Sequence, residues 1–181
     1  MINFKFLNFK LRKLVNTKTG GYSLVEMIIY VAILSVISFL VINTTLSFTR
    51  GYRDIVALRI VDHSGIDVME RITRDIRLST QIDDANSIFN TNPGVLSLIY
   101  TTGGVSTITK FYLDGGIVKL DIDGVYFGPL SLSGATVSSL VFTKLNSGIS
   151  NAVKIDMTVS GTVGTVTKTK TYHSTVILRA I

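Results

Sequence analysis

The chain of 181 residues contains no cysteine and no tryptophan, and it has only two prolines, Pro93 and Pro129. Without cysteine, neither a disulfide framework nor a thiolate metal site can form. The fold must therefore be held by packing alone or by a bound ion. Both prolines lie in loop-like contexts, and none precedes Pro93, so no proline interrupts a helix in the first half of the chain.

Charge is absent from residues 27–42, which lie within an apolar run of 19 residues, Leu24–Ile42. At ~1.5 Å per residue a helix of this length spans roughly 28 Å, enough to cross the hydrocarbon core of a membrane. Basic side chains precede the run and no acidic residue accompanies them: Lys5, Lys10, Arg12, Lys13 and Lys18. The positive-inside rule then predicts a single-pass protein, with residues 1–21 in the cytoplasm and the C-terminal part outside it.

Two other interpretations of the apolar run were weighed. A buried helix of a soluble core is disfavoured, because a chain of this length leaves little protein to surround a long helix at its N-terminus. A secretory signal peptide would need a small-residue cleavage site after the run. Residues 43–50 offer no good site of that kind, and the glycine pair Gly20-Gly21 lies on the cytoplasmic edge instead. A cut there would remove the basic leader and keep the helix.

Glu26 is a carboxylate at the head of this apolar run. An ionised acid inside a membrane costs ~2.5–3.5 kcal/mol even on lenient insertion scales, so such a residue usually has a function. The segment Gly21-Tyr22-Ser23-Leu24-Val25-Glu26 resembles the prepilin cleavage and methylation motif of type IV pilins and type II secretion pseudopilins. The family more often has Phe at the Tyr22 position and Thr at the Ser23 position, and both differences preserve size and character.

The resemblance implies cleavage after Gly21 by a prepilin peptidase, N-methylation of Tyr22, and a filament-assembly role for Glu26. It also implies partners: other pilin or pseudopilin subunits, an assembly platform in the inner membrane, and lipid. A buried amine and a buried carboxylate are each costly alone and much less so as a pair. Glu26 of one subunit could thus meet the Tyr22 amine of its neighbour and set their stagger. A glutamate that merely reaches toward the headgroups is the plainer alternative.

The net charge of +6 is mostly a property of the leader. Five of the 18 basic residues lie in residues 1–21, so a mature chain would keep 13 basic and 12 acidic residues. The basic balance is therefore weak support for nucleic-acid binding, and we expect none. Four lysines of the second half are the candidates for a basic face, and lysines that protect strand edges explain them equally well: Lys144, Lys154, Lys168 and Lys170.

Beyond the membrane run, apolar residues recur at intervals of three and four and predict that the helix continues, from about Ser23 to about Ser79. The predicted stripe is Leu58, Val61, Gly65, Val68, Met69, Ile72 and Ile76. Gly51 and Gly65 are its weak points, and Gly65 could instead allow a strand to approach closely. Asp67–Arg71 and Glu70–Arg74 have the spacing of helical ion pairs.

After Asp84 the pattern changes to strands joined by glycine-containing turns. The expected strands are Val95–Thr101, Thr107–Leu113, Ile117–Ile122, Ser138–Leu145, Ala152–Ser160 and Thr167–Arg179. The predicted fold class is α+β: a long N-terminal helix, membrane-spanning in its first half and amphipathic in its second, packed on an antiparallel β-sheet head. The expected organisation is a removed leader (1–21), a transmembrane and filament-core helix (22–48), and an amphipathic helix with a globular head (49–181).

Other motifs are weaker. Asp121-Ile122-Asp123-Gly124 begins like a calcium loop but lacks the remaining ligands, so a hairpin turn is preferred. Asp83-Asp84 with Asn86 could bind calcium, and a solvated turn is the safer interpretation. His63 and His173 lie far apart in the sequence without cysteine, which disfavours a metal site. No nucleophile elbow, phosphate loop or carboxylate–histidine cluster appears. We therefore expect no enzyme, cofactor or metal.

The stretches 69–77, 111–116 and 176–179 resemble J-type minor pseudopilins more than major subunits. The sequence thus predicts a pilin-like structural subunit, a minor pseudopilin of a type IV pilus or type II secretion filament. It would reside in the cytoplasmic membrane and then in the filament. A major pilin is the alternative within this class. A membrane-anchored adhesin or DNA-uptake receptor is the alternative from another class.

Overall fold

A computed structural model describes residues 20–146 and 151–178. Residues 1–19 of the predicted leader lie outside the described residues, as does Arg179, the last residue of the predicted strand Thr167–Arg179. The chain divides into two compact units, Met1–Ser47 and Phe48–Ile181. The boundary falls inside one continuous helix, α2, Leu24–Leu78. The predicted class, α+β with one long N-terminal helix and antiparallel strand pairing, is confirmed.

Helix α2 has 55 residues, and its limits lie within one residue of those predicted. At its start the carbonyl of Ser23 accepts the first helical bond, from the backbone N–H of Met27 at 3.1 Å. Glu26 lies in the first turn and Arg77 in the last, where a negative and a positive charge, respectively, interact favourably with the helix dipole. At the end, the Ser79 hydroxyl donates to the carbonyl of Ile76 at 2.7 Å and caps a carbonyl that the helix leaves free.

In the first unit the helix is long and apolar enough to cross a membrane, and none of its most apolar 18-residue window is buried. In the second unit one face of α2 is buried: Ala57, Val61, Ser64, Gly65, Val68, Met69, Ile72 and Ile76. The predicted stripe is therefore right from Val61 onward and wrong at Leu58, which is 43% exposed. Ala57 is fully buried instead, where Gly161 comes so close that a Cβ on it would lie 3.1 Å from the Ala57 carbonyl oxygen.

The strands form two antiparallel sheets, where the sequence predicted one. The first has the order β1-β2-β3-β4-β5 and the second the order β6-β7-β8. The strands are β1 Gln81–Ile82, β2 Val95–Thr102, β3 Val105–Asp114, β4 Ile117–Ile122, β5 Val125–Pro129, β6 Ala135–Asn146, β7 Asn151–Val163 and β8 Val166–Ile177. The short edge strands β1 and β5 were not predicted, and Pro129 ends β5 instead of lying in a loop.

The tight hairpins of the first sheet lie where the sequence placed turns. Asp123 and Gly124, between β4 and β5, have φ of 51° and 78°, the left-handed pair of a two-residue hairpin turn. The side chain of Asp123 accepts a bond from the Ile108 N–H at 2.7 Å, which ties this turn to β3. The hairpin interpretation of Asp121–Gly124 is therefore confirmed.

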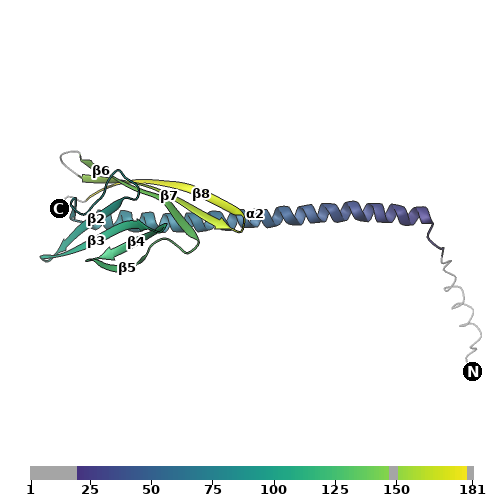
Figure 1. The fold of residues 1–181 in the computed structure, drawn as a ribbon, viewed down its shortest axis with the longest axis horizontal. Coiled ribbons are helices and arrows are strands. Elements are labelled where there is room, and N and C mark those ends of the chain that lie inside the picture. The colour runs from purple at the N-terminus through teal and green to yellow at the C-terminus, as the bar shows by residue number, and fades with distance from the viewer. Residues whose placement is uncertain (1–19, 147–150, 179–181) are drawn as a thin grey trace, which may run out of the picture. The chain divides into compact units, whose positions relative to one another are not determined.

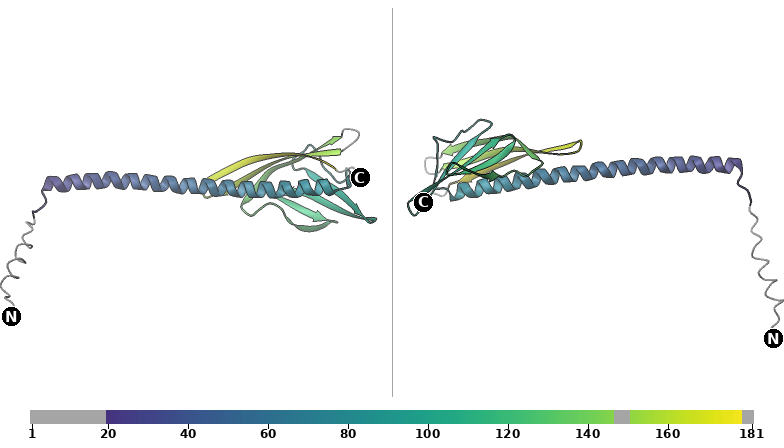
Figure 2. Two further views of the ribbon diagram at one scale, coloured as in Figure 1. Left: turned by 180° about the vertical axis from the view of Figure 1, so that it is seen from behind. Right: turned by 60° about the horizontal axis from the view of Figure 1, so that its bottom comes forward.

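Both sheets lie along the second half of α2 and share one core with it (Figure 1). The other directions of view show the same strands against the same stretch of helix (Figure 2). Backbone bonds join the sheets: the N–H of Val137 at the start of β6 donates to the Gly116 carbonyl of the β3–β4 turn at 2.8 Å. The central strand β7 supplies an alternating buried row, as predicted: Val153, Ile155, Met157 and Val159.

The ion pairs on the last turns of α2 differ from those predicted. Within the described residues Arg71 pairs with Asp75 at 2.8 Å, one turn later, and not with Asp67. Arg74 also lies 3.7 Å from Asp75, and in the described part of the chain it forms no ion pair with Glu70. Both arginines are drawn to Asp75, whose side chain is mostly buried and therefore gains more from a cation than an exposed acid does.

Candidate functional site

The candidate site begins with the segment that enters α2. Gly20 and Gly21 are exposed and non-helical, and a Cβ on either would meet nothing within 4 Å. Tyr22 is 72% exposed, and the helix begins two residues later. A peptide bond after Gly21 thus lies in exposed chain outside the helix, where a peptidase can reach the backbone. The predicted cleavage at Gly21 and methylation of Tyr22 stay predictions.

Glu26 is the one residue between Gly20 and Tyr52 that is not exposed. Its Oε1 accepts a hydrogen bond of 2.7 Å from the hydroxyl of Tyr30, four residues later. The rings of Tyr22 and Tyr30 meet edge to face, with centroids 6.3 Å apart and planes at 80°. Residues 26 and 30 are one turn apart on one face of the helix, so Tyr30 lies beside the carboxylate, and Tyr22, which precedes the helix, lies against the Tyr30 ring.

Other polar side chains of this stretch bond to their own helix. The hydroxyl of Ser35 donates to the Val31 carbonyl at 2.7 Å, and the hydroxyl of Thr44 donates to the Leu40 carbonyl at 2.8 Å. A backbone carbonyl in lipid has no water to bind, and such bonds let hydroxyls stay within an apolar segment. The stretch is therefore compatible with hydrocarbon despite its polar residues.

Tyr30 is the site residue that sequence analysis missed. Its spacing from Glu26 is the i,i+4 spacing at which helical side chains meet, so the signal was in the sequence. Tyr30 was missed because a tyrosine inside an apolar run is counted as one more hydrophobic residue. The structure therefore adds a hydrogen-bond donor to a site that was predicted as a lone carboxylate.

The four lysines considered as a basic face are each paired with an aspartate. Lys154 lies 2.9 Å from Asp156, and Lys144 pairs with Asp84. The other two lysines hold β8 to α2: Lys168–Asp54 at 3.3 Å and Lys170–Asp62 at 2.7 Å. A phosphate backbone would have to compete with these carboxylates for every lysine.

Asp62 is held by two donors from β8. The Lys170 ammonium donates to its Oδ1, as does the Tyr172 hydroxyl at 2.8 Å. These hydrogen bonds lower the pKa of the Asp62 carboxyl, Lys170 contributing most. Burial and the same carboxylate raise the pKa of Tyr172 well above its ordinary value. The cluster has a structural role: it fastens β8 across the helix.

The carboxylates weighed as calcium ligands already have donors. Asp83 is 9% exposed, and its Oδ2 accepts bonds from the Asn86 amide at 2.7 Å and the Ser97 hydroxyl at 3.2 Å. The bond from Asn86 is the main cause of the lowered pKa of Asp83. Within residues 20–146 and 151–178, no group of three or more histidine, aspartate or glutamate side chains is placed to hold a metal ion.

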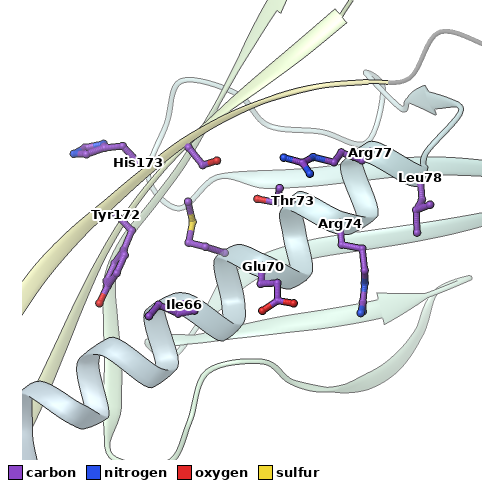
Figure 3. Close-up of a pocket in the computed structure, with 10 residues that line it drawn as sticks. Ile66, Glu70, Thr73, Arg74, Arg77, Leu78, Tyr172 and His173 are labelled. Atoms are coloured by element: carbon purple, nitrogen blue, oxygen red, sulfur yellow. The ribbon is translucent and has the colours of Figure 1, made fainter.

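A groove of about 610 Å³ lies between the C-terminal part of α2 and residues 172–174 of β8. Figure 3 shows Glu70, Arg74 and Arg77 on the helix; on the strand, Tyr172 points toward the helix and the ring of His173 points away from it. Ile66 and Leu78 add exposed apolar surface, at 55% and 57% exposure. His173 bonds to Asp156 across the β7–β8 pair and so belongs to the outer sheet surface as well.

No protein-family model, curated protein or solved structure matches this chain. Its function must therefore be argued from its own residues.

Proposed function

We propose that this chain is a pilin-like structural subunit that is cleaved after Gly21, N-methylated at Tyr22 and assembled into a filament through the first half of α2. The proposed partners are a prepilin peptidase and methyltransferase, other pilin-like subunits and an inner-membrane assembly platform. The protein would start as a single-pass protein of the cytoplasmic membrane, with its β-rich part outside the cytoplasm. Among filament subunits, we favour a minor pseudopilin.

One observation carries the proposal: a single helix with a sheltered carboxylate at the start of an exposed apolar half. From Tyr22 to Thr49 Glu26 is the one charged side chain, and most of the exposed residues around it are apolar. The second half of the same helix packs into a folded unit. A helix with such surface needs lipid or other helices around it, and a carboxylate placed there needs a cation.

Cleavage would supply that cation. A cut after Gly21 creates an amine on Tyr22, at the membrane edge and next to the start of the helix. In a bundle of staggered helices, the amine of one subunit and Glu26 of the next neutralise each other. A subunit in the wrong register leaves two charges unpaired in a medium of low dielectric constant, which is strongly unfavourable. The pair would therefore set the stagger of the filament.

Intact-mass measurement of the membrane-extracted protein tests the proposal. The expected product begins at Tyr22 and carries one methyl group. Gly21→Leu should block the cut and leave membrane insertion unchanged, because the leader charges and the apolar run are untouched. Gly20→Leu is the matched control, since both glycines are exposed and uncrowded, and it should still be cut. An uncut wild-type chain, or a product that begins after residue 43, would overturn the proposal.

The alternative of a DNA-uptake receptor gains no support from the lysines, each of which has an aspartate partner. An adhesin remains an alternative that shares the anchor and differs in what the head binds. The abundance of the protein in sheared filaments separates a minor subunit, which should be scarce, from a major subunit, which should dominate the mass. Quantitative mass spectrometry measures this directly.

A further inference from the structure

A hydrogen bond from Tyr30 distinguishes Glu26 from the rest of its helix segment. Glu26 is partly buried although the segment around it is exposed, and the ring of Tyr30, which donates the bond, also contacts the ring of Tyr22. Within residues 20–146 and 151–178, the Glu26 carboxylate is engaged through Oε1 alone, by the Tyr30 hydroxyl at 2.7 Å. A carboxylate can accept several hydrogen bonds, so Oε2 keeps its capacity for a further donor.

In hydrocarbon, a carboxylate without a donor is far less stable than in water. The backbone N–H groups that precede Met27 have no partner within the helix, yet the hydrogen bond that the described residues give to the Glu26 carboxylate comes from the Tyr30 side chain. A side-chain hydroxyl one turn away is therefore a valuable partner. The other hydroxyls of this stretch for which we describe bonds, on Ser35 and Thr44, donate to backbone carbonyls instead. Tyr30 differs from them because it donates to a charged side chain, and charge-assisted bonds are the stronger kind.

We propose that Tyr30 is a positioning residue for Glu26: its hydroxyl holds the carboxylate on the Tyr30 face of the helix while the subunit is alone in the membrane. Oε2 is then left for the amine of a neighbouring subunit. The second half of this inference rests on the proposed function, whereas the hydrogen bond itself does not. Tyr30 thus lowers the cost of keeping Glu26 in lipid before assembly, without occupying the oxygen that assembly needs.

A double-mutant cycle on membrane insertion of the full chain tests the pair. The measured quantity is the ratio of inserted to non-inserted chains, scored by protease protection of residues 49–181, in a Val36→Ser background that lowers insertion into a measurable range. On apolarity alone, Tyr30→Phe should raise this ratio. With Glu26 present we expect a decrease instead, about threefold or more, because the carboxylate loses its donor. In a Glu26→Val chain the same substitution should raise the ratio.

Ser35→Ala is the matched control, because it removes a hydroxyl from the same helix that bonds to a backbone carbonyl. It should change the ratio equally with Glu26 and with Val at that position. The proposal is wrong if Tyr30→Phe changes the ratio by the same factor in both backgrounds, or if Ser35→Ala shows the same coupling to Glu26 as Tyr30→Phe does.

Cleavage scored on the same samples separates this inference from the proposed function. Tyr30→Phe leaves Gly21 and the leader intact, so its chain should still be cut after Gly21. Coupling between Tyr30 and Glu26 in a chain that is never cut would support the hydrogen bond and refute the pilin-like function. Normal cleavage without coupling would refute the positioning role and leave the pilin-like function standing.

Discussion

The ring of Tyr172 occupies the space that a side chain at Gly65 would need: a Cβ there would lie 2.3 Å from Cε2 of the ring. Gly65 is on the buried face of α2, and Tyr172 is on β8, which crosses the helix at this point. The Tyr172 hydroxyl then reaches Asp62, one turn before Gly65. The expectation that Gly65 allows a strand to approach closely is therefore confirmed.

Gly65→Ala should lower the free energy of unfolding of the 49–181 unit by about 1–3 kcal/mol, because the methyl group overlaps the Tyr172 ring and pushes its hydroxyl from Asp62. Urea unfolding followed by circular dichroism measures the change. Gly51→Ala is the matched control: its Cβ meets nothing within 4 Å, so helix propensity alone should leave stability unchanged or raise it by up to ~1 kcal/mol. Equal effects of the two substitutions would contradict the close approach.

Ile72→Asp should unfold the head or destabilise it by several kcal/mol, because Ile72 is fully buried in the shared core and a charge there has no partner. Ile66→Asp lies less than two turns earlier on the same helix, at 55% exposure, and should change stability by less than ~1 kcal/mol. Thermal melting of both variants in the 49–181 fragment checks this prediction. A normal melt for Ile72→Asp would mean that the helix does not pack as described.

Acid should destabilise the head through Asp83. Hydrogen bonds lower the pKa of this carboxyl in the folded protein, so the folded state binds its proton less readily than the unfolded state does. The stabilisation is therefore present at neutral pH and is lost as the pH falls below about 4, where an unfolded aspartate takes up its proton. Asp83→Asn should flatten this dependence, measured as urea midpoints between pH 3 and pH 7.

Asp84 provides the comparison for Asp83 at neutral pH. Asp83→Ala leaves the Asn86 amide and the Ser97 hydroxyl without their acceptor and should cost ~1–3 kcal/mol. Asp84→Ala removes a surface ion pair with Lys144 and should cost no more than ~1 kcal/mol. A larger loss at Asp84 than at Asp83 would show that the loop is held differently.

Glu26→Val should make the helix more stable in lipid and yet impair incorporation into the filament, because the amine of a neighbouring subunit loses its partner. Glu26→Gln should have a milder effect, since an amide oxygen still accepts a hydrogen bond. Co-purification of tagged variants with sheared filaments measures incorporation. Wild-type incorporation of the Val variant would contradict the register pair, except for a subunit located at the filament tip, where one neighbour is missing.

Local features of this protein could be predicted from the sequence because they depend on residues a few positions apart. The limits of α2 follow from Ser23, the apolar periodicity and Ser79, and the β4–β5 turn follows from Asp123-Gly124. The partnership of Tyr30 with Glu26 was equally local and was missed only because tyrosine was counted as apolar. The assembly role of Glu26 rests on the sequence and stays a prediction.

Tertiary structure alone decided which distant segments meet. The strands divide into two sheets instead of one because β6 pairs with β7, and the backbone groups that join β6 to the first sheet come from turns. The place where β7 and β8 cross the helix decides that Ala57, and not Leu58, is buried. It also decides that Lys168 and Lys170 pair with aspartates of α2. Strand pairing and helix–sheet crossing are set by the packing of the whole core, which no short stretch of sequence encodes.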